Sequence, residues 1–211
     1  MPDTISAIIL AGGRATRMGG VDKGLIEIAG EPMIKHVLRA IAPQVGAIAI
    51  NANRNIARYE AFGYPVISDD LEDFQGPLAG MAAGLQWCPG ERLLTLPCDG
   101  PLVPSDLVAR LATALNGGDV AVAHDGERLQ SVHALINKAC LPSLQAFLAS
   151  GERKIDRWYA ELDCREADLS DRSALFINVN TPEQQAAYDD MLERMEARHR
   201  ESRALRRAMR S

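Results

Sequence analysis

Residues 5–23 read ISAIILAGGRATRMGGVDK, a short apolar run followed by a loop with two glycine pairs. The run from Ile5 to Leu10 carries no charge, which is typical of a strand buried on both faces of a parallel sheet. Gly12 and Gly13 end this run, because paired glycines favour the sharp turns and close backbone approaches of a loop. The stretch therefore predicts a buried strand that leads into a glycine-rich loop.

The loop also carries three cations, Arg14, Arg17 and Lys23. Glycines let backbone N–H groups approach an anion, and cationic side chains supply the countercharge that a triphosphate needs. The spacing matches neither G-x-x-x-x-G-K-[ST] nor G-x-G-x-x-G, the two common phosphate-binding loops. We therefore predict a phosphate-binding loop of another kind, in which Lys23 and Arg17 act as catalytic cations on the phosphates.

The composition fits one globular domain. The chain has 211 residues, of which 47% are apolar, and its net charge of −5 gives the bulk of the protein no electrostatic reason to bind nucleic acid or an anionic membrane. The four cysteines form no C-x-x-C pair and the four histidines have no metal-ligand spacing. No stretch approaches the roughly 20 apolar residues of a membrane span. We expect a cytoplasmic protein with reduced thiols and neither a membrane nor a nucleic-acid partner.

Short apolar runs alternate with segments of helical period, which indicates an α/β fold in three layers, with a mostly parallel sheet and helices on both faces. From residue 119 two runs joined by a tight turn favour a small antiparallel element in the second half. The expected strands are 5–10, 47–51, 64–68, 92–96, 120–124, 129–136 and 175–178. The expected helices are 33–42, 55–62, 78–87, 105–115, 138–150 and 154–161, and Thr181-Pro182 predicts the start of another.

We interpret residues 1–190 as a single domain. Within it, residues 1–118 form the nucleotide-binding half and residues 119–190 the half that binds a second substrate. Residues 191–211 form a basic tail, in which seven arginines face three glutamates and give a local charge of +4. The sequence leaves open whether the tail is helical or disordered. A solvated extension is the favoured interpretation, and an arm that docks an acidic partner or nucleic acid is the alternative.

Polar residues follow several of the predicted strands. In an open parallel sheet the ligand crevice lies beyond the carboxyl ends of the strands, so Asn51, Asp69 and Asp99 are predicted to meet at one crevice with the glycine loop. We expect Asp99 to hold Mg²⁺, a hard cation that prefers one or two carboxylates together with phosphate oxygens and water. Asn51 and Asp69 are candidate partners of a base or ribose. Simple turn formation remains the alternative for Asn51 and Asp99.

Three segments in this order, Leu10-Ala11-Gly12-Gly13, Arg17-Met18-Gly19-Gly20 and Asp22-Lys23, resemble the molybdenum cofactor guanylyltransferases. These belong to the nucleotidyltransferases of Rossmann-like fold, and the resemblance extends to about residue 190. It implies catalytic roles for Lys23, Arg17 and Asp99, with Asp99 as the ligand of Mg²⁺ and with Mn²⁺ as the alternative metal. The implied GTP-binding residues are Leu10, Ala11, Gly12, Gly13, Lys23, Asn51, Asp69 and Asp99.

The resemblance also implies a molybdopterin site in the second half. Asn178 and Asn180 correspond to the family segment at the pterin end, and Arg153 or Lys154 would meet the acceptor phosphate. Residues 76–80 resemble a segment that borders the nucleotide pocket. For the two asparagines, hydrogen bonds to nearby backbone groups are the alternative.

The implied activity is that of a nucleotidyltransferase that transfers GMP from GTP to molybdenum-molybdopterin and releases pyrophosphate. One alternative is a related enzyme that uses CTP or a different phosphate acceptor. The other is a noncatalytic adaptor that delivers the cofactor, with the tail as its docking element. The expected protein partner is a molybdoenzyme or a cofactor-delivery protein, and the sequence does not identify which one.

Overall fold

The computed structural model describes residues 5–11, 22–69, 76–179, 184–186 and 188–189. Several predicted features lie outside these residues: Gly12, Gly13, Arg17, Asn180, the helix start at 181–182 and the tail. Within the described part, no helix is both long and apolar enough to cross a bilayer.

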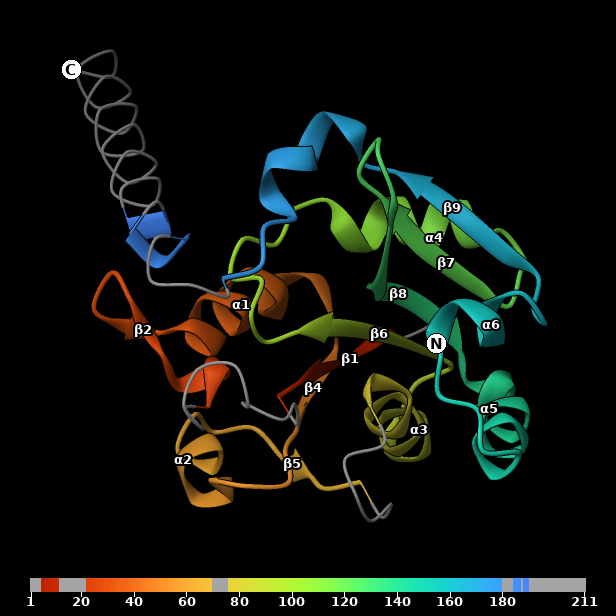
Figure 1. Cartoon of the computed structure of the whole chain (residues 1–211), viewed down its shortest axis with the longest axis horizontal. Coiled ribbons are helices and arrows are strands. Elements are labelled where there is room, and N and C mark those ends of the chain that lie inside the picture. Colours follow the sequence, from red (N-terminus) through yellow and green to blue (C-terminus); the bar gives the residue numbers. More distant parts are fainter. Residues whose placement is uncertain (1–4, 12–21, 70–75, 180–183, 187, 190–211) are drawn as a thin grey trace.

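The described residues form one seven-stranded sheet (Figure 1). The strand beginning at Ile5 lies inside the sheet and pairs in parallel with a neighbour on each side. A fourth parallel strand lies at one edge of the sheet, whereas the strand Leu129–Asn137 runs antiparallel to both of its neighbours. Across the sheet the strands are β5 (Val66–Ile67), β4 (Ala47–Asn51), β1 (Ile5–Leu10), β6 (Arg92–Pro97), β8 (Leu129–Asn137), β7 (Val120–His124) and β9 (Cys164–Asp168). The predicted mostly parallel α/β sheet with an antiparallel element is confirmed.

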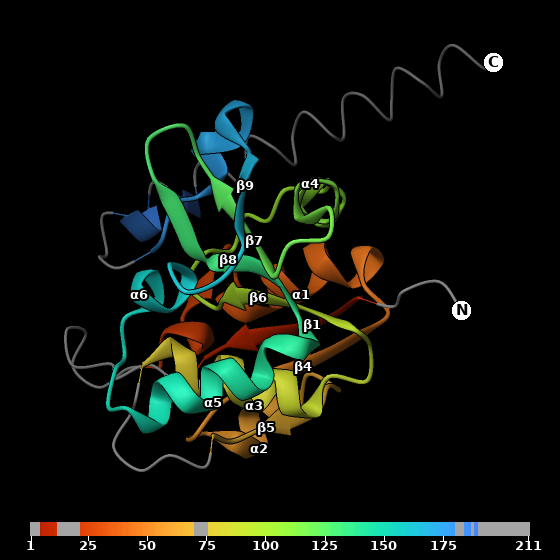
Figure 2. The same ribbon diagram turned by 90° about the vertical axis from the view of Figure 1, so that its right-hand side faces the viewer.

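Helices cover both faces of this sheet (Figure 2). Successive residues of β1 point to opposite faces, so Ala7 and Ile9 pack in one core cluster and Ile8 packs in another. The first cluster contains side chains of α1 (Met33–Ile41), α2 (Ile56–Glu60) and α4 (Leu107–Leu115). The second contains those of α3 (Pro77–Trp87), α5 (Leu141–Ala149) and α6 (Ile155–Tyr159). The three predicted layers are therefore present.

Short elements complete the fold. The 3₁₀ helices within the described residues are η2 (Lys23–Leu25), η3 (Ala42–Gln44), η4 (Lys138–Cys140) and η5 (Ser170–Leu175). A small hairpin that was not predicted joins β2 (Glu27–Ile28) to β3 (Glu31–Pro32). Its turn residues Ala29 and Gly30 both have positive φ, 50° and 75°, as a type I′ turn requires. Alanine is an unusual residue at such a position, so the turn left little signal in the sequence.

Helix α3 packs closely on the sheet because it carries two inward glycines one turn apart. A Cβ atom on Gly84 would stand 2.8 Å from the side chain of Ile8, and one on Gly80 would stand 2.3 Å from Oδ1 of Asn51. Both distances are far below van der Waals contact. The two glycines therefore let α3 approach the ends of β1 and β4.

One predicted strand is wrong. Residues 175–178 end the 3₁₀ helix η5 and continue without regular structure, and the last strand is instead β9. Only Ala167 of β9 is fully buried, because this strand lies at the edge of the sheet and exposes charged residues. Its composition resembles that of a loop, whereas the apolar run from Leu175 resembles a strand. Burial of Phe176 and Val179 explains that run without a strand.

Candidate active site

The carboxyl ends of the parallel strands are level with one another. Asn51 at the end of β4 is in register with Leu10 of β1, and Leu10 is in register with Pro97 of β6. The ladder continues past the strands: Ala11 N–H donates to the Asn51 carbonyl at 2.8 Å, and Cys98 N–H donates to the Leu10 carbonyl at 3.2 Å. Neighbouring strands lie about 4.8 Å apart, so Asn51 and Pro97 are separated by roughly 10 Å.

Lys23 and Asp99 lie side by side at this edge. The Lys23 ammonium is 3.2 Å from Oδ2 of Asp99, and the two side chains are 29% and 18% exposed. The backbone carbonyl of Asp99 also accepts a hydrogen bond from Val179 N–H at 2.9 Å. Three segments far apart in the sequence therefore meet at Asp99, and they bring a cation and a carboxylate to one partly exposed point.

The side chains of Asn51 and Asp69 are held by neighbouring groups. Asn51 is 2% exposed, and its Nδ2 donates to the carbonyl of Ile67 in β5 at 3.0 Å. Asp69 Oδ1 accepts from Nδ2 of Asn53 at 2.9 Å, while Asp69 N–H donates to Oδ1 of Asn53 at 3.0 Å. Asn53, which the sequence interpretation did not assign, thus fixes Asp69. The roles of Asn51 and Asp69 toward a nucleotide remain predictions.

Asn178 lies beside the glycine that follows Asp99. A Cβ atom on Gly100 would be 3.4 Å from Oδ1 of Asn178 and 3.9 Å from Nε2 of His133. His133 is 4% exposed and packs edge-on against Phe176, with ring centroids 5.1 Å apart. Burial lowers the pKa of His133 to about 4, so the ring is neutral near pH 7. His133 was missed because a histidine in an apolar strand is ordinarily a core residue.

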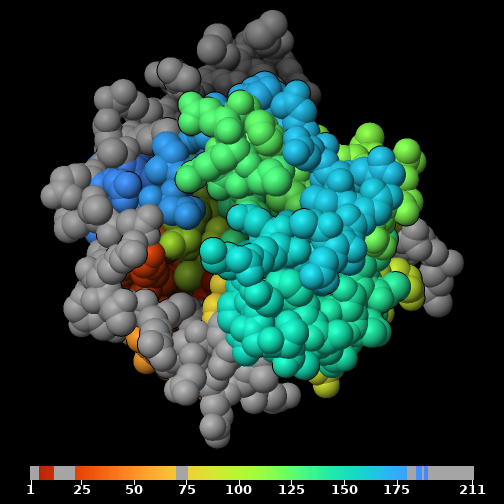
Figure 3. Space-filling view, turned by 45° about the vertical axis from the view of Figure 1, so that its right-hand side comes forward, coloured from red at the N-terminus to blue at the C-terminus, as the bar shows by residue number. Residues whose placement is uncertain are grey.

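Arg153 and Lys154 lie between α5 and α6. Nη1 of Arg153 donates to the carbonyls of Leu148 and Glu152, at 2.8 Å and 2.6 Å, next to the end of α5. Lys154 is exposed and directly precedes α6. The space-filling view shows the surface hollowed between red, yellow-green, blue and cyan segments, which the bar places near residues 25, 100, 175 and 150 (Figure 3). Both halves of the chain therefore border one hollow.

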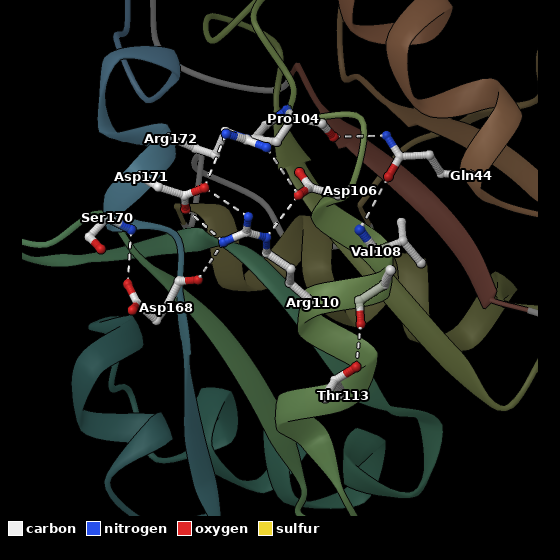
Figure 4. A network of polar contacts seen from close by, with 11 residues as sticks. Gln44, Pro104, Asp106, Val108, Arg110, Thr113, Asp168, Ser170, Asp171 and Arg172 are labelled. Atoms are coloured by element: carbon white, nitrogen blue, oxygen red, sulfur yellow. Dashed lines mark hydrogen bonds and ion pairs between the residues drawn. The ribbon is translucent and has the colours of Figure 1, made fainter.

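A polar network holds the segment that leads to Asn178 (Figure 4). Arg110 of α4 donates to both carboxylate oxygens of Asp171 in η5, at 2.7 Å and 2.9 Å, and its Nε donates to Asp106 at 2.9 Å. Gln44 ties the same region to η3 through the Pro104 carbonyl at 2.9 Å. Because two parallel bonds fix direction as well as distance, the Arg110 pair orients η5 against α4.

The chemistry available around Asp99 is electrostatic. Among the described residues, no three His, Cys, Asp or Glu side chains lie close enough together to hold a metal ion. A single carboxylate is nevertheless compatible with Mg²⁺ that also binds phosphate oxygens and water. Burial, reinforced by nearby Asp99, raises the pKa of the Cys98 thiol, which therefore stays protonated and is a poor nucleophile.

A separate groove of about 260 Å³ lies between α3 and α5. Asp69 borders it together with alanines of α3, whereas Lys23, Asn51 and Asp99 do not. Asp69 therefore lies at the margin between this groove and the strand ends.

Known proteins resemble this chain in sequence and in fold. A family model described as the MobA-like NTP transferase domain matches residues 7–166. The molybdenum cofactor guanylyltransferase of Shewanella loihica is 53% identical over 186 residues, which are 87% of this chain and 95% of that protein. Molybdopterin-guanine dinucleotide biosynthesis protein A from Archaeoglobus fulgidus has a TM-score of 0.75 at 19% identity, over 90% of this chain and 99% of that one.

The fold is shared more widely than the sequence. The 2-C-methyl-D-erythritol 4-phosphate cytidylyltransferase from Thermus thermophilus has a TM-score of 0.66 at 13% identity, over 88% of this chain and 98% of that one. Likeness at this level of identity shows the architecture only. The family match and the 53% identity to the Shewanella loihica protein show membership of a family as well as a shared fold. From them we conclude that the chain belongs to the MobA-like NTP transferases.

Proposed function

We propose that this protein transfers GMP from GTP to the terminal phosphate of molybdenum-molybdopterin and releases pyrophosphate. The observation that carries the proposal is the Lys23–Asp99 pair, which stands 3.2 Å apart at the level carboxyl ends of β1, β4 and β6. The choice of substrates is supported by the 53% identity to a molybdenum cofactor guanylyltransferase.

In this reaction an oxygen of the acceptor phosphate attacks the α-phosphorus of GTP in line with the leaving group. A new bond forms between that oxygen and the α-phosphorus, and the bond from the α-phosphorus to the bridging oxygen of pyrophosphate breaks. The Lys23 ammonium stabilises the negative charge that develops on the phosphates, and Arg17 is proposed to assist it. No covalent enzyme intermediate is needed, because positioning and charge stabilisation suffice for phosphoryl-type transfer.

Asp99 is the residue proposed to hold Mg²⁺, with Mn²⁺ as the alternative. When bound, the metal would supply positive charge to the triphosphate. Asp99 fits this role because its carboxylate is partly exposed and lies next to Lys23, so both groups can reach the same phosphates.

Each of the two substrates is assigned to one half of the chain. Asn51 and Asp69 are proposed to contact the guanine or ribose, together with the loop of Gly12 and Gly13. Asn178 and Asn180 are proposed to contact the pterin, and Arg153 or Lys154 its phosphate. The position of Asn178 beside Gly100 supports this arrangement, since Gly100 directly follows Asp99.

A nucleotide competition tests the proposed substrate. Pyrophosphate release is measured with the molybdenum-molybdopterin acceptor and Mg²⁺, using GTP, CTP and ATP separately and in competition. We expect release with GTP to exceed that with the other two by a large factor, because a site that hydrogen-bonds one base rejects another by about 10⁴ in favourable cases. Preferred use of CTP would refute guanylyl transfer. Binding of GTP without pyrophosphate release would favour the cofactor-delivery adaptor instead.

Replacement of Asp99 tests the site. We expect Asp99→Ala to lower the rate by on the order of 10² or more, as the loss of comparable electrostatic groups does. Asp163→Ala is the matched control, because Asp163 is half exposed and pairs with Arg165 on the edge strand. Full activity of Asp99→Ala with Mg²⁺ would remove Asp99 from the metal site.

A further inference from the structure

A buried carboxylate directly precedes Lys23. Asp22 is 6% exposed. Its Oδ1 accepts a hydrogen bond from the hydroxyl of Tyr59 at 2.5 Å, and its Oδ2 accepts from Nδ2 of Asn55 at 3.0 Å. Nε of Arg54 lies 3.6 Å from the same Oδ2. Burying a carboxylate is costly unless it is paired and hydrogen-bonded, and this one has three partners.

The three partners come from one segment that follows β4. Arg54 and Asn55 lie between β4 and α2, and Tyr59 lies within α2 and is fully buried. Burial, together with neighbouring Cys98 and Asp22, raises the pKa of Tyr59 well above its usual range. The hydroxyl therefore remains a hydrogen-bond donor to Asp22 at any pH at which the protein is assayed.

The Tyr59 hydroxyl also contacts the residue on the other side of Lys23. A Cβ atom on Gly24 would stand only 2.7 Å from that hydroxyl oxygen and 3.3 Å from Cβ of Cys98. Asp22 and Gly24 are thus both packed against Tyr59, and Lys23 lies between them at the start of η2. The residues on both sides of Lys23 therefore contact the hydroxyl of the same buried tyrosine.

We propose that Asp22 and Tyr59 are positioning residues that hold the Lys23 ammonium in place for the phosphates of the nucleotide. The inference rests on the proposed function, in which Lys23 stabilises the transferred phosphate. A lysine side chain has four flexible carbons, so a fixed backbone limits the positions that its ammonium can reach. Displacement of a catalytic group by about 1 Å can cost as much as 10²-fold in rate.

A double-mutant cycle separates positioning from simple stabilisation. Tyr59→Phe removes the hydroxyl and keeps the ring, and we expect it to lower kcat/KM for GTP by about tenfold. In a Lys23→Ala background the same change should cause little further loss, since residues that act through one another are not additive. A purely structural contribution would lower activity by the same factor in both backgrounds.

Controls keep the cycle interpretable. Tyr64→Phe removes the hydroxyl of another tyrosine, which is partly buried and packs against the same core cluster just before β5, and we expect it to leave kcat/KM unchanged. All variants are assayed well below their melting temperatures. If turnover of Lys23→Ala is below detection, the cycle is measured on the dissociation constant for GTP by titration calorimetry, with the same expected non-additivity.

The outcomes of the two proposals differ. If Lys23→Ala retains full activity, the proposed role of Lys23 fails, and the positioning role of Asp22 and Tyr59 fails with it. If Lys23→Ala is impaired and Tyr59→Phe is either harmless or additive, only the positioning inference is overturned. Gly24→Ala is a second test of the same inference. Its methyl group should displace the Tyr59 hydroxyl, and it is expected to lower kcat/KM as Tyr59→Phe does.

Discussion

The two glycines of α3 offer a test of whether Asn51 binds the nucleotide. Gly80 and Gly84 lie one turn apart in the same helix and both face the sheet. Replacing either with alanine gains about 1 kcal/mol of helix propensity. Either new methyl group would also crowd a neighbour, but only Gly80→Ala would crowd Asn51. A comparison of the two variants therefore distinguishes a general packing defect from a displacement of the Asn51 side chain.

The magnitudes follow from the contacts. The added methyl group would stand 2.3 Å from Oδ1 of Asn51 in Gly80→Ala and 2.8 Å from the side chain of Ile8 in Gly84→Ala. Such overpacking costs about 1–3 kcal/mol, so after the gain in propensity each variant should lose about 0–2 kcal/mol of unfolding free energy. Losing one hydrogen bond from Asn51 to the nucleotide costs about 0.5–1.5 kcal/mol, which weakens GTP binding by about two- to tenfold in Gly80→Ala alone.

The assay combines a titration of GTP with Mg²⁺ and a thermal melt of each variant. We expect the two variants to melt within a few degrees of each other, with the dissociation constant for GTP raised only in Gly80→Ala. Unchanged GTP affinity in a folded Gly80→Ala protein would show that the Asn51 side chain is not used for binding. Equal weakening in both variants would assign the effect to packing of α3.

Three further predictions concern stability and orientation. Because burial lowers the pKa of His133 from 6.5 to about 4, the unfolded chain takes up the proton first as pH falls. The free energy of unfolding, measured with urea, should therefore fall by up to about 3 kcal/mol between pH 6.5 and 4. His133→Leu should remove this fall, and an unchanged pH dependence in that variant would contradict the prediction. Arg110→Ala should speed amide exchange across Ser170–Leu175, and equal exchange would show that Asp171 does not anchor η5. Asn53→Ala should weaken GTP binding by releasing Asp69, and unchanged affinity in calorimetry would exclude a role for that carboxylate.

The positions of the strand ends could be predicted from the sequence, whereas the partners around them could not. Asn51 and Asp99 each end or follow an apolar run, and the carboxyl ends of parallel strands meet at one edge of a sheet whatever the details of packing. The contact of Tyr59 with Asp22 spans 37 positions and depends on how α2 docks, which no local pattern encodes. The same applies to His133, whose proximity to Gly100 arises only because β8 reverses direction beside β6.

Local patterns also misled where burial and exposure did not follow the usual alternation. The edge strand Cys164–Asp168 exposes most of its residues, so its charged composition concealed it. Leu175 ends the 3₁₀ helix η5 and Phe176 follows it, and both are apolar because they pack against core clusters, not because they pair in the sheet. An apolar pattern in the sequence indicates which side chains are buried. It predicts a strand correctly only where the buried residues also pair with a neighbouring strand.

The antiparallel strand β8 has a consequence for how two substrates would meet. It joins the second half of the chain to β6 through a continuous backbone ladder, from Arg92 opposite Asn137 to Thr95 opposite Ala134. Among the described residues, the two halves are therefore joined by one continuous sheet. The separation between a nucleotide over β1 and an acceptor beside β8 would thus be set by the spacing of the strands within that sheet.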